Sequence, residues 1–232
     1  MTVLKKGSRG AEVVRLQRLL GITADGKFGS KTKASLQKFQ RDRGLYADGV
    51  AGLLTWMALE GKLKAFVRPP DNKQYDSRWG SKLYTATKNK SQTIRSSGCG
   101  PTSMCDIINA WFDKRVTPAD LCKIAVQKGY RTANSGTSWS FFTHMATRYP
   151  FSRFLSTADH DKAVKALAEG ALVVASMGPG FWTKGGHFIC LWKNDGRTMY
   201  ACDPANSSRK SQLMAKFRGQ RKRYFIFWPP VA

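Results

Sequence analysis

Two copies of the pattern Asp-Gly-x-x-Gly restrict the first quarter of this chain to a narrow range of folds. The copies span residues 25–29 and 48–52, and each stands directly before an apolar segment with helical spacing. The glycines supply left-handed turn positions, and each aspartate supplies a local side-chain cap. A repeated unit of loop followed by helix predicts a small all-helical module.

The segments around these loops have the spacing of three short helices. The first follows Gly10 and ends at Gly21, the second is capped by Ser30 and ends at Gly44, and the third covers 53–59. The residues expected to face inward are Val13, Leu16, Leu19 and Leu20 in the first helix and Ala34, Leu36 and Phe39 in the second.

Several spaced motifs of this region agree in order with a known family. They are Lys6-Gly7-Ser8-Arg9-Gly10, Leu16-Gln17, both Asp-Gly loops, Phe39-Gln40 and Thr55-Trp56. Residues 1–62 thereby resemble the three-helix peptidoglycan-binding domain of cell-wall hydrolases. The resemblance implies a non-catalytic anchor on the cell wall, and the residues expected near the ligand are Asp25, Phe28, Asp48 and Trp56. The alternative is that the same residues build a small helical fold for another ligand.

A basic stretch that closes on Pro69-Pro70 separates this module from the rest of the chain. Its composition is typical of a linker, which we place at residues 63–71. Residues 72–232 remain for a second and larger domain, within the usual size of a single domain.

The centre of that second domain is the heptapeptide 97–103, Ser-Gly-Cys-Gly-Pro-Thr-Ser, followed by an apolar run. Pro101 suits the first turn of a helix, so Cys99 is expected at the positive end of the helix dipole. Unpaired backbone N–H groups at that position favour a thiolate and can bind an oxyanion. Cys99 is therefore a candidate nucleophile, and a buried structural cysteine is the alternative.

Further along, the hydrophobic period changes from helical to strand-like. Helices are expected at 101–113, 117–128, 138–149 and 159–169, and strands at 171–177, 187–193, 197–202 and 224–228. Helices first and antiparallel strands afterwards predict an α+β fold, with helices packed on an antiparallel sheet.

A hairpin signal at 194–196, Asn-Asp-Gly, brings two chemically useful residues together. If these three residues form the loop, Asp203 lies opposite His187 at about 5 Å. A carboxylate beside an imidazole that faces a thiol is the nucleophile, base and orienter arrangement of thiol acyl transfer. Asn206 is the alternative orienter, in which case Asp203 only ends its strand.

Four motifs of the second domain resemble the papain-like cysteine peptidases related to bacteriocin-processing peptidases. The resemblance spans about residues 75–228, and its first motif begins at Gln74. These motifs are Gln74-x-Asp76-x-Arg78-Trp79, Gly98 to Ser103, Gly186-His187-Phe188-Ile189, and Asp203-Pro204 with Asn206. The resemblance implies Cys99 as nucleophile, His187 as base, Asp203 as orienter and Gln74 as donor to the oxyanion. The chain departs from the family at Asp106, a carboxylate in the nucleophile helix.

The net charge of +24 is spread over the whole chain, with +9 before Pro70 and +15 after it. Such a charge favours polyanions, including teichoic acids and lipopolysaccharide of a bacterial envelope. No nucleic-acid-binding motif accompanies it, so a specific nucleic-acid partner is not expected. The five cysteines include no CxxC pair, which favours reduced thiols over a disulfide framework or a zinc site, and no cofactor is implied.

No apolar segment is long enough to span a membrane, and no secretory signal follows the first basic residues. We therefore expect a protein made in the host cytoplasm that acts on the wall after release, as endolysins do. The expected activity is cleavage of peptide bonds in peptidoglycan. The alternatives are an amidase that cuts the muramic acid–stem peptide bond, a peptidase that matures a secreted peptide, a wall-binding protein with an inert peptidase domain, and a cation that disrupts membranes.

Overall fold

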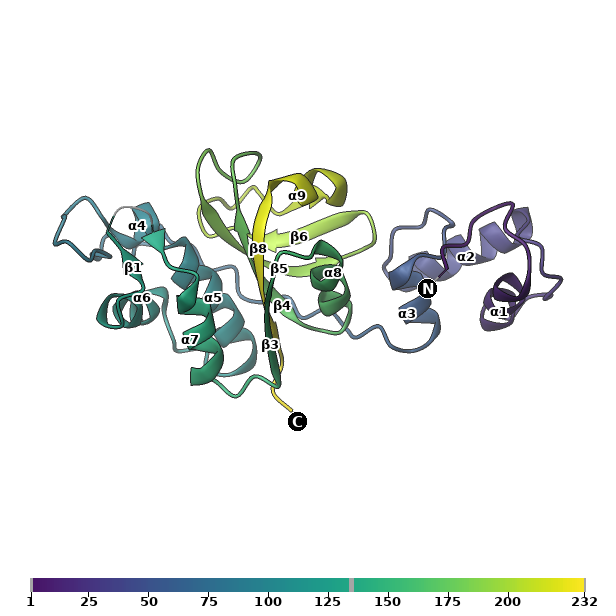
Figure 1. The fold of residues 1–232 in the computed structure, drawn as a ribbon, viewed down its shortest axis with the longest axis horizontal. Coiled ribbons are helices and arrows are strands. Elements are labelled where there is room, and N and C mark those ends of the chain that lie inside the picture. Colours follow the sequence, from purple (N-terminus) through teal and green to yellow (C-terminus); the bar gives the residue numbers. More distant parts are fainter. Residues whose placement is uncertain (1, 134–135, 232) are drawn as a thin grey trace. The chain divides into compact units, whose positions relative to one another are not determined.

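The computed structural model of the protein describes residues 2–133 and 136–231, and Figure 1 shows its elements. Met1 and Ala232, the outer limits of the two predicted domains, lie outside the described residues. The chain divides into two compact units, Met1–Ala65 with Asn194–Thr198, and Phe66–Lys193 with Met199–Ala232. Within the described residues, no helix has the length and apolar character that crossing a membrane requires.

The N-terminal unit contains the three helices that the sequence predicts. They are α1 (Ala11–Leu19), α2 (Ser30–Asp42) and α3 (Leu53–Leu59). Their shared core consists of Leu4, Val13, Leu16, Phe28, Leu36, Ala51 and Trp56. The start of α2 differs by one residue from the expected one, because Gly29 and not Ser30 occupies its N-cap.

A buried glutamine organises each Asp-Gly loop, and the two networks repeat atom for atom. The amide nitrogen of Gln17 lies 2.7 Å from Asp25 Oδ1 and 3.1 Å from Thr32 Oγ1, while its carbonyl accepts the N–H of Gly26 at 2.9 Å. The corresponding contacts of Gln40, 23 residues later in every position, are to Asp48 (3.0 Å), Thr55 (3.1 Å) and Gly49 (2.9 Å). The internal repeat is therefore a repeat of hydrogen bonding as well as of sequence.

These networks change which side chains face the core of the unit. On α2 the buried residues are Thr32, Leu36 and Gln40, whereas Ala34 is exposed and Phe39 is half-buried. The predicted inward position of Leu19 on α1 is also wrong, since that side chain is 43% exposed. The apolar pattern alone misplaced the buried face because two polar side chains with complete hydrogen bonding take part in it.

The second unit is built on an antiparallel sheet. Within the described residues six strands follow the order β3-β8-β4-β5-β6-β7, and β1 and β2 form a separate antiparallel pair. The strands are β1 (Arg131–Thr132), β2 (Gly136–Thr137), β3 (Arg153–Thr157), β4 (Leu172–Met177), β5 (His187–Asn194), β6 (Thr198–Cys202), β7 (Ser211–Leu213) and β8 (Arg221–Trp228). The central strand β4 is buried along its whole length.

Helices cover both faces of this sheet (Figure 1). The helices of the unit are α4 (Ile94–Ser97), α5 (Cys99–Trp111), α6 (Pro118–Gln127), α7 (Ser140–Arg148), α8 (His160–Ala168) and α9 (Met214–Gln220). Helices α5 to α7 lie on one side, and α8 and α9 lie on the other. Burial on both faces explains why β4 reads as a continuous apolar run and not as an alternating one.

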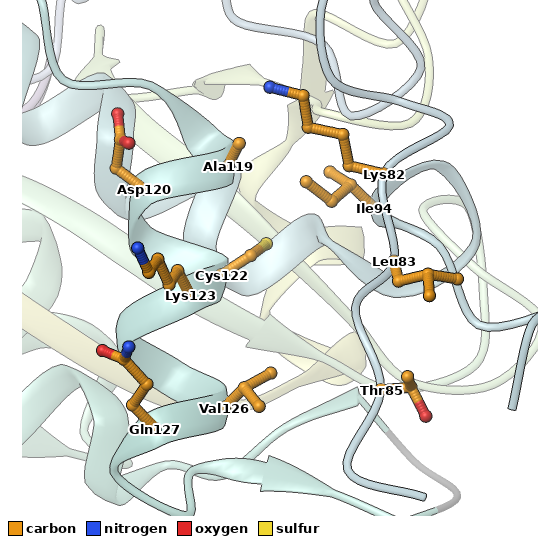
Figure 2. A pocket seen from close by; sticks show the side chains of 10 residues that line it. All are labelled: Lys82, Leu83, Thr85, Ile94, Ala119, Asp120, Cys122, Lys123, Val126 and Gln127. Carbon is orange, nitrogen blue, oxygen red and sulfur yellow. The ribbon is translucent and has the colours of Figure 1, made fainter. Parts of the chain in front are cut away.

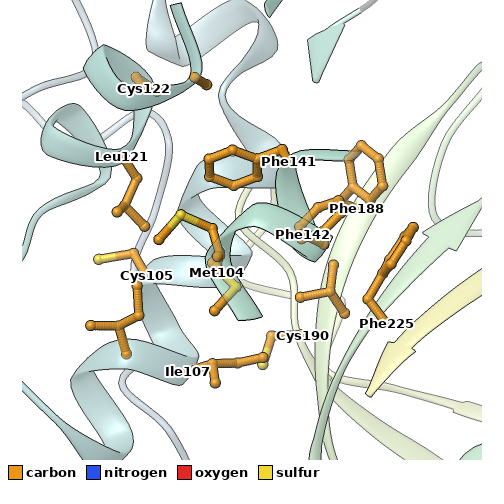
Figure 3. Packing of buried hydrophobic residues seen from close by; sticks show 14 of the residues in the cluster. Met104, Cys105, Ile107, Leu121, Cys122, Phe141, Phe142, Phe188, Cys190 and Phe225 are labelled. Carbon is orange, nitrogen blue, oxygen red and sulfur yellow. The ribbon is translucent and has the colours of Figure 1, made fainter. Parts of the chain in front are cut away.

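The main core fills the space between the sheet and helices α5 to α7. Figure 3 shows side chains of the three helices, among them Met104, Leu121 and Phe142. The ring of Phe142 lies beside Phe188 of β5 and Phe225 of β8. The rings of Phe142 and Phe225 stack with their centroids 4.4 Å apart. This packing fixes the N-terminal end of α5 against the start of β5, which sets the position of the site described below.

Candidate active site

Cys99 is the first residue of α5, and its two glycine neighbours allow close packing around it. A Cβ atom on Gly98 would lie 2.6 Å from the side chain and from the carbonyl oxygen of Ile94. One on Gly100 would lie 2.9 Å from Cβ and Oγ1 of Thr137. The glycines therefore let the short helix α4 and strand β2 approach the start of α5 without a clash. Cys99 itself is half-buried at this helix end.

His187 opens β5, and its ring meets the carboxylate of Asp203. The distance from His187 Nε2 to Asp203 Oδ1 is 2.7 Å, and both side chains are buried. The backbone N–H of Ala205 donates to the same Oδ1 at 2.9 Å. The pair forms although the hairpin loop lies one residue later than predicted, since β5 extends through Asn194 and β6 starts at Thr198.

The other neighbour of His187 is the thiol of Cys99, and each of the two groups shifts the pKa of the other. Burial alone would raise the pKa of the Cys99 thiol. The hydrogen bond and charge of His187, with the backbone N–H groups of Phe188 and Gly100, outweigh burial and hold that pKa below its ordinary value.

The pKa of the His187 imidazole depends on the same contacts. Burial would lower the pKa of His187, but its hydrogen bonds to Asp203 and Cys99 raise it to about 9. A thiol and an imidazole with pKa values shifted in these directions favour the thiolate–imidazolium pair. Such a pair in an open cleft can attack a carbonyl carbon and then protonate a leaving group.

Gln74 lies in the same cavity as Cys99 and His187. Its backbone N–H donates to Pro204 O at 2.9 Å, and its side-chain nitrogen donates to Arg95 O at 2.5 Å. One hydrogen of that nitrogen is used in this bond, and the amide nitrogen carries a second one. The position fits a donor to an oxyanion in the cleft.

Asn206, the alternative orienter, has a different role in the structure. Its side-chain oxygen accepts the backbone N–H of Ser208 at 2.8 Å and that of Arg209 at 3.3 Å, as in an Asx turn. The carboxylate that meets His187 belongs to Asp203.

The cavity around Cys99 has a volume of 830 Å³. It is polar, with hydroxyl side chains from α4 and β2 and a tryptophan at the start of α7. Its lining residues include Gln74, Ser97, Cys99, Arg131, Thr137, Trp139, Ser176, Thr183, His187 and Lys222. Trp139 is 43% exposed, so a broad aromatic face borders the cleft.

Two tertiary contacts near the site were not expected from the sequence. Asp106 is fully buried on α5, where its Oδ1 accepts the backbone N–H of Asn72 at 3.0 Å and the side-chain N–H of Asn72 at 2.8 Å. Asp106 thus ties the segment that carries Gln74 to the nucleophile helix. Arg209 forms an ion pair with Asp203. No local pattern marks either contact, because the partners stand 34 and 6 residues apart in the sequence and neither pair belongs to a motif.

The remaining histidines and cysteines take part in packing. His160 Nδ1 lies 2.7 Å from the hydroxyl of Tyr224 on the opposite side of the sheet, and the ring of His144 packs on Tyr130 with a centroid distance of 5.3 Å. All five cysteines are free, and the four other than Cys99 are buried: Cys105, Cys122, Cys190 and Cys202.

The residues predicted to contact the wall have mixed positions in the N-terminal unit. Phe28 and Trp56 are 2% and 1% exposed and belong to its core, so their rings offer almost no surface to a ligand. Asp25 and Asp48 cap the two loops through Gln17 and Gln40. Asp25 also lines a cavity of 740 Å³ beside the first loop.

A further cavity of 470 Å³ lies between α6 and the segment before α4 (Figure 2). Its walls include Leu83, Cys122 and Val126, together with the lysines Lys82 and Lys123, and it contains none of the predicted site residues. Within the described residues, no group of three or more histidine, cysteine or acidic side chains is arranged to hold a metal ion.

Comparison with known proteins extends these observations. Residues 9–59 match the putative peptidoglycan binding domain, and residues 82–227 match the Peptidase_C39 like family. A zinc D-Ala-D-Ala carboxypeptidase of Streptomyces albus G is 44% identical over 61 residues, which are 23% of this chain and 24% of that protein. The chain covers 24% and 35% of the lengths of the curated relatives that it matches.

Two solved structures are similar to parts of the chain. The endolysin of Burkholderia phage AP3 is 36% identical over 30% of this chain and 29% of its own, with a TM-score of 0.28. The peptidase domain of Streptococcus ComA is 15% identical over 59% of this chain and 93% of its own, with a TM-score of 0.46. With a peptidoglycan-binding domain before it and a match over more than half of the chain, the protein belongs to the Peptidase_C39 like family.

Proposed function

We propose that this protein is a cell-wall hydrolase that cleaves peptide bonds of bacterial peptidoglycan by a Cys-His-Asp thiol mechanism. The observation that carries the proposal is that Cys99 and His187 line one 830 Å³ cleft and that His187 is hydrogen-bonded to Asp203, in a chain that also has a peptidoglycan-binding domain. The peptidase family supports peptidase chemistry, and the binding domain supports the wall as its substrate.

In the first half of the reaction, the Cys99 thiolate attacks the carbonyl carbon of the scissile bond. The developing oxyanion accepts hydrogen bonds from the second N–H of the Gln74 amide and from backbone N–H groups at the start of α5. His187, as imidazolium, then gives its proton to the leaving nitrogen while Asp203 holds the ring. The carbon–nitrogen bond breaks, and an acyl thioester forms on Cys99.

In the second half, water replaces the leaving amine. Neutral His187 takes a proton from that water, and the hydroxide attacks the thioester carbon. The carbon–sulfur bond breaks, the new carboxylic acid leaves and releases its proton to the solvent, and the thiolate–imidazolium pair is restored. No redox partner is needed for this cycle.

The net charge of +24 adds a second attraction to the envelope. Teichoic acids and lipopolysaccharide carry many negative charges, so a protein of this charge is concentrated on their surface at low ionic strength. We propose that this attraction works together with the binding domain, and that the domain supplies the preference for peptidoglycan.

The test is mass spectrometry of fragments released from purified peptidoglycan by the wild type and by Cys99→Ala. We expect new amino termini at one position of the stem or cross-bridge with the wild type, and a loss of at least about a thousandfold in release with Cys99→Ala. Cys122→Ala, which removes a buried thiol outside the cleft, is the matched control and should retain activity.

The alternatives give different fragments. Cleavage at the lactyl amide would identify an amidase with the same residues, whereas release of nothing from walls of several chemotypes with binding intact would identify an inert wall-binding protein. Lysis of cells that is unchanged by Cys99→Ala would indicate that charge alone disrupts the envelope, and would overturn the proposal.

A further inference from the structure

The carboxylate of Asp203 has a cationic partner besides His187. Arg209 Nε lies 2.9 Å from Asp203 Oδ2, the oxygen that does not face the imidazole. The contact is an ion pair in which the carboxylate is fully buried and the arginine side chain is 25% exposed. The two oxygens of Asp203 are thereby divided between His187 and Arg209.

The same guanidinium also holds the loop that leads into β5. Arg209 Nη1 donates to the carbonyl oxygen of Trp182 and, at 3.3 Å, to that of Phe181. Trp182 is almost completely buried, and its indole N–H donates to Gln212 at 2.8 Å. The loop 178–186 is therefore held at Phe181 and Trp182, and its residues Thr183 and Gly186 line the cavity around Cys99.

Arg209 adds a positive charge beside the three reacting groups. Cys99 as thiolate and Asp203 carry two negative charges, and His187 as imidazolium carries one positive charge. The ion pair with Arg209 offsets the remaining negative charge of this group, and an uncompensated buried charge is costly.

Three other cations lie near these groups. Lys73 donates to the backbone oxygen of Asp203 at 2.7 Å and is paired with Asp71. Arg131 donates to the carbonyl oxygens of Tyr84 and Gly136, both at 2.8 Å. Lys222 is exposed at the edge of the cleft. Among the arginines and lysines of the described residues, Arg209 is the one that forms an ion pair with the carboxylate of Asp203, whose other oxygen meets His187.

We propose that Arg209 is a positioning residue of the active site, which holds Asp203 and the loop 178–186 in one arrangement so that His187 stays aimed at an ionised Cys99. This inference rests on the proposed thiol mechanism. Loss of Arg209 leaves a net negative charge beside the thiolate and frees the carboxylate to rotate. Both effects act in the same direction, because each makes the thiolate harder to form.

The test measures how fast iodoacetamide alkylates Cys99 in the full chain as a function of pH, with the modified residue identified by mass spectrometry. This readout needs no wall substrate. The rate of alkylation rises with pH as the thiol ionises, and this rising part of the profile is its acid limb. For Arg209→Met and Arg209→Gln, we expect the midpoint of the acid limb to rise by about one pH unit and the alkylation rate at pH 6 to fall about tenfold. Arg209→Lys, which keeps the charge, should recover most of that shift.

The matched control is Arg218→Met, which removes an arginine from an exposed ion pair with Asp161. It should have the wild-type profile. Thermal unfolding of each variant is measured in parallel, so that a loss of stability is separated from a change in ionisation. If Arg209→Met does not fold, Arg209→Gln decides, because its uncharged amide can still donate to a backbone carbonyl.

Wild-type acid limbs in both Arg209→Met and Arg209→Gln would overturn the inference, even if stability falls, because a purely structural arginine leaves the ionisation of Cys99 unchanged. The failure of the proposed function looks different. In that case Cys99 of the wild type itself is alkylated with the acid limb of an ordinary thiol near pH 8.5.

Discussion

The ionisation of His187 sets the upper pH limit that we expect for the reaction. Its pKa in the folded protein, about 9, lies above the 6.5 of a free imidazole. The imidazolium therefore persists up to that pH, and both the ion pair and its contribution to stability are lost as the pH rises through 9. We predict that kcat/KM falls about tenfold per pH unit above pH 9.

This prediction is checked with a soluble muropeptide between pH 5 and 11. Asp203→Asn provides the comparison, because the carboxylate is one of the two groups that raise the pKa of His187. Its upper limit should move to lower pH. A wild-type rate that stays constant to pH 10.5 would contradict the assignment of His187 as the proton donor.

Gly100 is a residue beside Cys99 where the site tolerates little additional volume. An added Cβ would meet Thr137 at 2.9 Å, and Thr137 is itself held by the hydroxyl of Tyr84 at 2.7 Å. We predict that Gly100→Ala lowers the free energy of unfolding by about 1 to 3 kcal/mol and reduces activity with it. Urea unfolding measures the change. Gly185→Ala, where the Cβ meets nothing within 4 Å, should differ little from the wild type.

Among the secondary-structure elements, helix α5 carries a buried carboxyl group whose ionisation has an energetic cost. Burial raises the pKa of Asp106 well above its ordinary value, despite the two N–H donors of Asn72. The folded state then keeps a proton that the unfolded chain releases, so stability falls as the pH rises above the unfolded pKa. We predict that Asp106→Asn, which keeps the acceptor oxygen, increases the free energy of unfolding at pH 8 by about 1 kcal/mol.

The check is chemical unfolding of both proteins at pH 5 and pH 8. The gain should be smaller at pH 5, where the carboxyl group of the wild type is closer to neutral in the unfolded chain as well. Equal destabilisation at both pH values would indicate that Asn72 requires the charged form.

The elements that could be predicted from sequence are those with local signals. Thr117 and Asp120 form the capping box at the start of α6 that their spacing indicates. The two-residue strands β1 and β2, the short edge strand β7 and the polar strand β3 have no comparable signal, because sheet pairing and not local pattern makes them strands.

In the candidate site, too, the residues in local motifs could be predicted from the sequence and the tertiary contacts could not. Cys99, His187 and Asp203 stand in local motifs, and the structure brings their side chains together. Their roles in catalysis remain predictions. The contacts of Arg209 and Asp106 come from tertiary packing, which no spacing encodes. For the same reason the burial of Trp56 could not be read from its aromatic character alone.

At the scale of the whole molecule, the two units have separate hydrophobic cores, so each is expected to fold without the other. We predict that a chain of residues 66–232 cleaves a soluble muropeptide as fast as the full chain does. On intact walls it should be at least about tenfold slower at low protein concentration, because the binding domain raises the local concentration of enzyme. Fragment release and turbidity measure the two activities.

Salt distinguishes the two attractions that hold the full chain on the wall. The shortened chain 66–232 still carries +16, so its residual wall activity should depend strongly on charge. Raising sodium chloride from 50 to 500 mM should then remove most activity of the shortened chain on walls that contain teichoic acid, and less of the activity of the full chain. If both proteins lose activity in parallel, charge and not the binding domain retains the enzyme. If neither does, the attraction is carried by contacts that salt does not screen.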